Sequence, residues 1–219
     1  MEIMARLLFV FFISVVHLNM MAQNPLAITG QVKCQGDGVA NVVVTNGFDC
    51  VLTDASGKYT IPYHRDARFV YVTTPAGYLP QRDGSLPLFY QHIIEGTFIY
   101  DFSLVKNPRN DDRHLFLVQA DVQLGKGEDV AAYAEYLKDM REFINRHSEY
   151  DLFVLDCGDI VGNALSLFPS YKQTSDVLDV PMYRVIGNHD MEYGVRSYEH
   201  SYKTYEECFG PIYYSFNRG

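Results

Sequence analysis

Several patterns that would mark a common class of protein are missing from this sequence. It has no long run of basic residues, and 18 Lys and Arg face 27 Asp and Glu, for a net charge of −9. This balance argues against non-specific binding to nucleic acid, and an anionic substrate would need local positive charge such as a metal ion. No Cys-x-x-Cys pair occurs among the four cysteines, which argues against a zinc site built from thiolates.

Motifs of nucleophilic and nucleotide-binding enzymes are missing as well. There is no Gly-x-Ser-x-Gly, and Cys157 ends an apolar segment without an evident base, which disfavours a serine or cysteine hydrolase. We expect Cys157 to be a buried free thiol. The segment 125–127 is too short to cradle a phosphate and is expected to be a turn. Cys34 and Cys50 are close enough in the chain to pair, although the sequence does not fix the connectivity.

One long apolar run lies near the N-terminus. Residues 7–16 follow Arg6, are too short to span a bilayer, and are followed by the small residue Ala22 at a suitable cleavage point. We therefore predict a signal peptide over residues 1–22 and an exported protein, periplasmic or extracellular. An uncleaved N-terminal anchor is the alternative. No later apolar run is long enough to cross a membrane, so we expect no membrane span after signal removal.

Residues 25–105 have a β-like pattern. Short segments rich in β-branched and aromatic residues alternate with glycine-containing turns, and none has the 3.6-residue period of a long helix. The expected strands are 28–32, 41–45, 58–61 and 68–73, with 92–100 as a final one. The stretch around Pro80, Gly84 and Pro87 is expected to be a loop. We predict an all-β sandwich here, with a spacer or docking role.

A polar segment with one proline, residues 106–112, predicts a linker, and the pattern changes after it. Apolar strand segments now alternate with segments of helical spacing. The expected strands are 114–120, 151–156, 181–186 and 212–216, and the expected helices lie around 130–144, 165–178 and 198–208. Pro169 should interrupt the second of these helices or mark a later start. This alternation predicts a mostly parallel sheet with helices over it.

Three of these strands end in polar clusters. Asp121 and Gln123 follow the first strand, Gly158-Asp159 follows the second, and Gly187-Asn188-His189-Asp190 follows the third. The carboxyl ends of parallel strands lie on one edge of a sheet, where loops converge. We therefore expect the side chains of Asp121, Gln123, Asp159 and Asn188 to point at a shared place. All four offer oxygen ligands, which suit Mg, Mn or similar hard cations.

The order of these clusters resembles the first three motifs of calcineurin-like metallophosphoesterases, which are Asp-x-His, Gly-Asp and Gly-Asn-His-Asp/Glu. The first region, through Gly30-x-Val32 and Thr53-Asp54-x-x-Gly57, is similar to the transthyretin-like or carboxypeptidase-regulatory-like sandwich of exported bacterial proteins. The combination resembles exported members of the Bacteroidetes type.

The resemblance implies a role for each matching residue and two divalent metal ions (Mn, Fe, Zn or Mg). Asp121 would bind the first metal, Asp159 would bridge both, and Asn188 would bind the second. His189 would face the substrate phosphate or the leaving oxygen, with Asp190 orienting its ring. A hydroxide bridging the metals would attack phosphorus in line.

Two departures from the family pattern set limits on this expectation. Gln123 stands where the family commonly has His, and its carbonyl is a harder, weaker ligand than imidazole. The family also supplies His ligands downstream, and no match to them follows Asp190. We therefore expect 112–219 to be the N-terminal half of a phosphoesterase domain in a C-terminally truncated chain. One face of its sheet is expected to lack a covering layer, and this face carries Phe116, Val118, Phe153, Leu155 and Val185.

The predicted function is hydrolysis of phosphate mono- or diesters by a metal-bridging hydroxide, with a phosphorylated small molecule or other phosphoester as substrate. The truncated chain itself is expected to be inactive. The alternative is a non-catalytic exported β-sandwich binding or docking protein that carries a phosphoesterase remnant.

Overall fold

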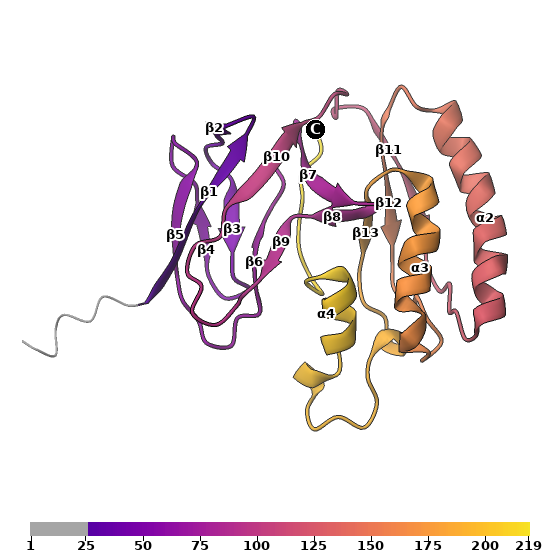
Figure 1. Cartoon of the computed structure of the whole chain (residues 1–219). Coiled ribbons are helices and arrows are strands. Elements are labelled where there is room, and N and C mark those ends of the chain that lie inside the picture. Colours follow the sequence, from indigo (N-terminus) through magenta and orange to yellow (C-terminus); the bar gives the residue numbers. More distant parts are fainter. Residues whose placement is uncertain (1–25) are drawn as a thin grey trace, which may run out of the picture.

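The computed structural model describes residues 26–219, so the predicted signal peptide over residues 1–22 lies outside it. These residues form two units side by side, a β-rich unit first and then a unit with a parallel sheet and helices (Figure 1). The predicted order, an all-β region followed by an α/β region, is confirmed. Across residues 26–219, none of the helices combines the length and the apolar character needed to cross a membrane.

The first unit consists of two sheets around one core. One sheet has the order β2-β1-β10-β7-β8, with β5 also paired to β1, and the other has the order β4-β3-β6-β9. In β5, buried Tyr59 and Ile61 alternate with exposed residues, as expected for a strand with one face on the core. The strands are β1 (Ala27–Cys34), β2 (Asp37–Gly38), β3 (Val43–Thr45), β4 (Cys50–Leu52), β5 (Lys58–Pro62), β6 (Phe69–Val72), β7 (Tyr78–Asp83), β8 (Leu86–Leu88), β9 (Tyr90–His92) and β10 (Phe102–Lys106).

Two predictions for this unit are wrong. The stretch around Pro80, Gly84 and Pro87 is the β7–β8 hairpin and not a loop. Pro80 pairs only with Leu104 of β10 and Pro87 lies on the edge strand β8, where a missing N–H is tolerated. Residues 92–100 are not one strand, because β9 ends at His92 and the chain turns before β10, which pairs parallel to β1.

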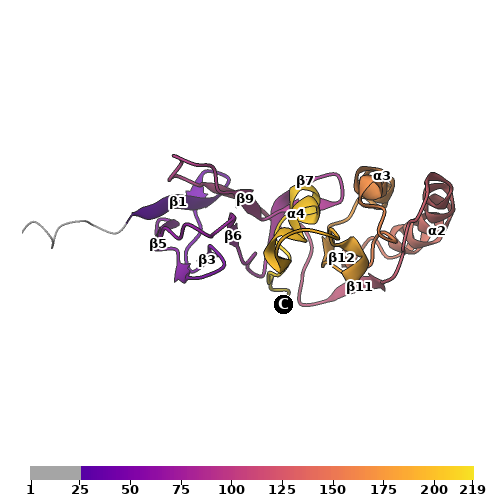
Figure 2. The same cartoon turned by 90° about the horizontal axis from the view of Figure 1, so that it is seen from below.

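The second unit confirms the predicted parallel sheet. Its strands β11 (His114–Gln119), β12 (Asp151–Asp156) and β13 (Met182–Arg184) pair in parallel in that order. Helices α2 (Gly127–Arg146) and α3 (Phe168–Ser175) cover one face of this sheet (Figure 2). Pro169 lies in the first turn of α3, where its missing N–H costs nothing, so the helix starts later than Leu165 as expected. Short 3₁₀ turns, η1 (Leu165–Leu167) and η2 (Asp176–Leu178), flank α3.

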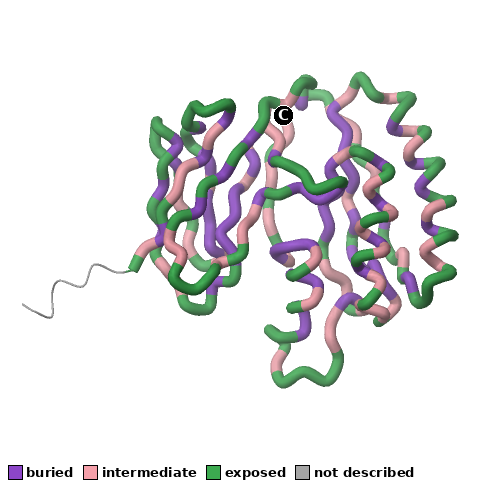
Figure 3. The backbone as a smooth tube through the Cα atoms, viewed as in Figure 1, coloured by how far each residue is buried: buried purple, intermediate pink, exposed green. Residues whose placement is uncertain are grey.

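Burial follows this layering. The strands are mostly buried, and α2 turns buried Tyr133, Leu137, Met140 and Ile144 inward while its outer face is exposed (Figure 3). Leu137 is fully buried, and the four residues fall at the spacing of one helical face. The core on the helix side of the sheet is therefore built by the second unit, with Leu86 of the β7–β8 hairpin added from the first.

The opposite face of the sheet is only half open, which corrects the expectation that it lacks cover. Phe153 is 4% exposed and Tyr183 is 2% exposed, because both join the core of the first unit. Phe116 and Val118, on the edge strand β11, are 51% and 54% exposed. The first unit thus covers the β12 and β13 side of this face and leaves the β11 side uncovered.

The C-terminal segment supplies part of that cover and is not the predicted fourth strand. After α4 (Lys203–Phe209) the chain leaves the sheet and runs against the first unit. Phe216 forms an isolated bridge with Thr74 and stacks on Tyr183 with ring centroids 3.9 Å apart. The Tyr213 hydroxyl donates to the carbonyl of Gly47 over 3.2 Å. Residues 212–216 alternate like a strand because one side faces the cores and the other faces solvent.

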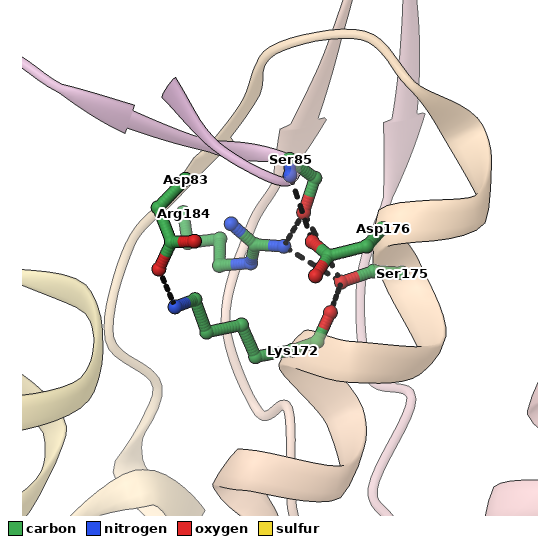
Figure 4. Close-up of polar contacts among 6 residues, drawn as sticks. All are labelled: Asp83, Ser85, Lys172, Ser175, Asp176 and Arg184. Carbon is green, nitrogen blue, oxygen red and sulfur yellow. Dashed lines mark hydrogen bonds and ion pairs between the residues drawn. The ribbon is translucent and has the colours of Figure 1, made fainter. Parts of the chain in front are cut away.

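The β7–β8 hairpin is seated on the second unit, at the end of α3 and beside β13 (Figure 4). The backbone N–H of Ser85 donates to Asp176 over 2.7 Å, and the backbone N–H of Met182 donates to the Ser85 carbonyl over 2.8 Å. The guanidinium of Arg184 donates to the hydroxyls of Ser85 and Ser175, both over 2.8 Å. We call this cluster the hairpin seat, and its residues are Asp83, Gly84, Ser85, Lys172, Ser175, Asp176 and Arg184.

Candidate functional site

The three polar clusters lie together at the carboxyl ends of the parallel strands. The loops after β11 and β12 continue the parallel pairing, since the Gln123 N–H donates to the Asp159 carbonyl over 2.9 Å and Leu124 bridges to Val161. The Asp121 N–H donates to the Gly158 carbonyl over 3.1 Å. These backbone bonds fix the two loops to each other before any side chain is considered.

Three candidate ligands have left-handed backbones. The φ angles are +57° at Asp121, +48° at Gln123 and +52° at Asp159. Such a conformation is uncommon outside glycine and costs roughly 1–3 kcal/mol per residue, and it clusters at binding and catalytic sites. Three left-handed residues in one pair of loops turn these side chains away from the strand direction and toward each other.

The side chains of these three residues meet. Nε2 of Gln123 lies 3.4 Å from Oδ1 of Asp121 and 3.5 Å from Oδ2 of Asp159. A half-turn of the Gln123 amide about its terminal bond would present the oxygen at the same place. The convergence expected from the strand ends is therefore present for Asp121, Gln123 and Asp159.

Two glycines permit the close approach of the second and third clusters. A Cβ at Gly187 would overlap the Asp159 carboxylate, and a Cβ at Gly158 would lie 2.6 Å from the Gly187 nitrogen. Gly158 also has a φ of +91°. The backbones of Gly-Asp and Gly-Asn-His-Asp thus pack against each other directly, and the His189 N–H donates to Oδ1 of Asp159 over 3.0 Å.

Asp190 does not orient the ring of His189, which corrects the expected role. Its buried carboxylate accepts hydrogen bonds from the backbone N–H groups of Gly187 (2.9 Å) and Val161 (3.0 Å). Burial raises the pKa of Asp190, although these hydrogen bonds oppose the shift. Asp190 therefore fastens the third cluster, in the turn η3 (Asn188–Asp190), to the loop after β12.

Asn163 contacts the ring of His189 instead. Its Oδ1 lies 3.0 Å from Nδ1 of His189, and its N–H donates to the His189 carbonyl over 3.2 Å. Asn163 also has a left-handed backbone, with φ of +66°. Sequence reasoning missed this residue, and the only signal available was a Gly-Asn pair four residues after Asp159.

Asn188 is exposed in the same turn. Its carbonyl accepts a hydrogen bond from the hydroxyl of Tyr193 over 3.3 Å, which ties the following loop to this edge. The side chain lies free of the contacts that join Asp121, Gln123 and Asp159. The structure thus places Asn188 beside these residues in the turn, with a side chain open to solvent.

A buried polar layer supports the site from below. Asp156 accepts from the Gly158 N–H over 3.1 Å, from Nε2 of Gln119 over 2.7 Å, and from the hydroxyl of Tyr171. Burial raises the pKa of Asp156, and Arg184 and these hydrogen bonds act against the shift. The tight turn at Gly158 is therefore held by a fixed acceptor inside the sheet.

The charges at the edge are not neutralised by basic side chains. Among residues 26–219, no ion pair involves Asp121 or Asp159. Two adjacent carboxylates with amide oxygens beside them are suited to a hard divalent cation. The same described range contains no group of three or more His, Cys, Asp or Glu residues arranged for a metal, so this donor set is two carboxylates and amides.

The cysteines differ from expectation. Cys157 is exposed, because its side chain points to the sheet face opposite Asp156, where the cover is incomplete. Cys34 is buried on the core side of β1 while Cys50 is exposed on β4, and both are unpaired.

Comparisons with known proteins place both units in one family. A family model described as the N terminal of calcineurin-like phosphoesterase matches residues 26–107, and one described as calcineurin-like phosphoesterase matches residues 114–218. A purple acid phosphatase from yellow lupin (Lupinus luteus) seeds is similar at 10% identity and a TM-score of 0.33, over 81% of this chain and 36% of that one. This chain thus spans about a third of that structure. No curated protein matches.

Proposed function

Because the chain belongs to the calcineurin-like phosphoesterase family, we propose that it takes part in metal-dependent hydrolysis of phosphate mono- or diesters at the carboxyl edge of β11, β12 and β13. The observation that carries this proposal is the meeting of Asp121, Gln123 and Asp159 on strained loops, without a basic partner among the described residues. In a purely structural cluster we would expect each carboxylate to have a basic partner, because two carboxylates held close together without one cost free energy.

The family resemblance implies which residues would hold the metals, and their oxygen donors fit that role. We assign Asp121 and Gln123 to one divalent ion, Asp159 to a bridging position and Asn188 to a second ion. All are oxygen donors, which favours Mn or Mg over metals that prefer imidazole or thiolate. When bound, such ions polarise phosphate oxygens and lower the pKa of a bound water.

His189 has a defined proton position in this arrangement. We assign the proton to Nδ1 of His189, which then donates to Oδ1 of Asn163. Nε2 is then the atom at which a proton is gained or lost. A leaving alcohol at Nε2 can receive that proton, which is general acid catalysis. The hydrogen bond from the His189 backbone N–H holds that backbone beside the Asp159 carboxylate, and the contact with Asn163 orients the ring.

Metal binding is the first test of this function, since it requires only the residues described above. Calorimetry with MnCl₂ should show saturable binding that is lost in Asp159→Asn and retained in Asp139→Asn, an exposed residue on α2. The absence of Mn²⁺ binding by the wild-type chain would contradict the proposal. The same variants are then assayed for hydrolysis of bis(p-nitrophenyl) phosphate, where neither the wild type nor either variant should show turnover, because no match to the family's downstream His ligands follows Asp190.

Export is proposed on the N-terminal sequence alone. A basic residue, a short apolar run and a small residue at position 22 support a signal peptide and a periplasmic or extracellular protein. Fractionation of expressing cells, with N-terminal sequencing of the product, tests it. Recovery of protein that begins at Met1 would contradict cleavage.

A further inference from the structure

A second polar cavity lies at the amino ends of β12 and β13, across the sheet from the candidate metal site. Its volume is about 310 Å³, and five segments line it: β7 of the first unit, the connection 107–109, the last turns of α2, and the chain leading into β12 and into β13. Ligand cavities occur preferentially where two units meet, and this size lies at the lower end of their usual range. The cavity therefore has the position and the size of a small-ligand site.

Its lining carries a local excess of positive charge. Three arginines, Arg82, Arg109 and Arg141, contribute to the lining along with Asp151 and Asp179. Asp151 is already paired with Arg218 over 2.9 Å, and Asp179 with Arg82 over 3.2 Å. Arg109 and Arg141 have no acidic partner among residues 26–219. Two positive charges stand unneutralised here in a chain whose net charge is −9.

Two of the three arginines are held in place, and Arg109 is exposed. Arg82 is fixed by Asp179, and Arg141 donates through Nη1 to the carbonyl of Leu178. Each guanidinium has five N–H donors, so both keep donors for a ligand. The C-terminal end of α2 also borders the cavity, but its partial charge of about −0.5 is smaller than the excess of the arginines.

Asn107 gives an independent sign of a missing acceptor. Its Oδ1 accepts from the N–H of Arg109 over 3.1 Å, which fixes the amide. Its Nδ2 is buried and has no hydrogen-bond partner among the described residues, and Asn107 lines the cavity. A buried donor without an acceptor is unfavourable, and a small shift of the Asn107 amide toward a ligand in the cavity would let Nδ2 donate to it.

We propose that this cavity binds a small oxyanion of charge −2, either as free phosphate or as the phosphate group of an organic monoester. Guanidinium groups recognise tetrahedral and carboxylate oxyanions through paired N–H donors, and two unneutralised arginines match a dianion. Ile144, Pro181 and the ring of Tyr150 also line the cavity, and they would contact the organic part of a monoester. The site does not depend on the proposed phosphoesterase activity, because it shares no residue with the carboxyl edge.

The test is phosphate binding by calorimetry in EDTA, at constant ionic strength with chloride as the balancing ion. EDTA removes metals, so the carboxyl edge makes no metal-dependent contribution. We expect saturable binding that weakens at least tenfold in Arg109→Gln, whose exposed side chain makes no contact that the fold needs. Arg146→Gln removes one charge from the last turn of α2 outside the cavity and should bind as the wild type does.

Two further measurements decide the outcome. Asp159→Asn should bind phosphate as well as the wild type, which separates this site from the metal site. Phenylphosphonate binding tenfold tighter than phosphate identifies an organic monoester as the ligand, and equal binding identifies free phosphate. The proposal is overturned if neither anion binds saturably, or if Arg109→Gln and Arg146→Gln lose affinity equally.

Discussion

The carboxyl edge and the hairpin seat are both polar clusters in which a glycine lets a backbone approach a carboxylate. At the edge, a Cβ on Gly187 would overlap the carboxylate of Asp159, and at the seat a Cβ on Gly84 would overlap that of Asp176. The seat is closed: Asp176 accepts from Ser85, and Arg184 is buried against two hydroxyls. The edge is open, and its carboxylates pair with no basic side chain of residues 26–219. The same local device therefore holds two units together in one place and prepares a binding site in the other.

Because one cluster is buried and the other faces solvent, substitutions should affect different properties of the protein. Buried polar groups that satisfy one another rigidify a fold and tolerate little change, whereas exposed unpaired carboxylates on strained loops are free to bind a ligand. Substitutions at the seat should reduce stability, and substitutions at the edge should reduce metal binding.

The largest effect is expected from Arg184→Leu. The substitution leaves the hydroxyls of Ser85 and Ser175 and the buried carboxylate of Asp156 without their cation, and removing one member of a buried charge network costs about 4 kcal/mol. Urea unfolding followed by circular dichroism measures it. Arg196→Ala, at an exposed position, is the control and should change stability by less than about 0.5 kcal/mol. A loss below 1 kcal/mol in Arg184→Leu would mean that the seat does not hold the units together.

Gly84→Ala should destabilise the protein by about 3 kcal/mol, since the new methyl group meets the Asp176 carboxylate and the backbone has a φ of +59°. Gly77→Ala is the matched control. Its φ is +77°, but nothing lies within 4 Å of the added atom, so only the backbone term of about 1 kcal/mol remains. Equal losses of unfolding free energy in the two variants would show that the hairpin can shift away from Asp176 at no cost.

Gly187→Ala is the counterpart at the edge. The methyl group would displace the Asp159 carboxylate and the η3 turn, so we expect the affinity for Mn²⁺ to fall about a hundredfold, or about 2.7 kcal/mol. Calorimetry with MnCl₂ measures the change, and circular dichroism confirms that the variant is folded. Gly127→Ala, with open space at its Cβ, should bind Mn²⁺ like the wild type. A folded Gly187→Ala protein with unchanged affinity would remove Asp159 from the metal site.

The two clusters also differ in how much of each could be predicted from the sequence. The neighbourhood of Asp121, Gln123 and Asp159 could be predicted, because the carboxyl ends of parallel strands share an edge whatever the details of packing. Asn163 could not, because its contact with His189 depends on the path of a loop. The hairpin seat could not be predicted either. Pro80 and Pro87 favour a loop by local propensity, and the hairpin is stable only because it pairs with β10 and packs against α3.

The C-terminal segment shows the same limit. Residues 212–216 alternate as a strand would, but alternation records only that one side is buried, and not what buries it. Here Tyr214 and Phe216 pack into the core shared with the first unit, and their backbone pairs with no strand of the parallel sheet.

A third contact between the two units, the ion pair of Glu206 with Arg68, should depend on pH. Glu206 of α4 is buried and paired with Arg68 of the first unit over 2.9 Å, and burial raises its pKa from 4.5 to about 7. The folded state holds a proton on Glu206 between these pH values that the unfolded state has lost. The contribution of Glu206 to stability is therefore highest below pH 4.5 and decreases as the pH rises toward 7.

We expect this group to contribute about 2 kcal/mol of the change between pH 5 and pH 7.5. Urea unfolding of the wild type and of Glu206→Gln at both pH values gives that contribution by difference. Other buried carboxyl groups whose pKa is raised, such as Asp190, cancel in the difference. Identical slopes in the two proteins would show that Glu206 is ionised in the folded state at pH 5.

The smallest effect is expected from Asn163→Gly, which removes the contact with His189 while keeping a residue that tolerates a φ of +66°. A hydrogen bond of about 1 kcal/mol corresponds to roughly a fivefold bias toward the Nδ1–H form of the ring. ¹⁵N NMR of the imidazole should show that bias disappear, with the free energy of unfolding changed by less than about 0.5 kcal/mol. His200, whose Nδ1 lies 2.8 Å from the Ser197 hydroxyl, is an internal control and should not change. An unchanged tautomer ratio at His189 would mean that Asn163 only closes the loop, and the open edge would then lack a positioned proton donor.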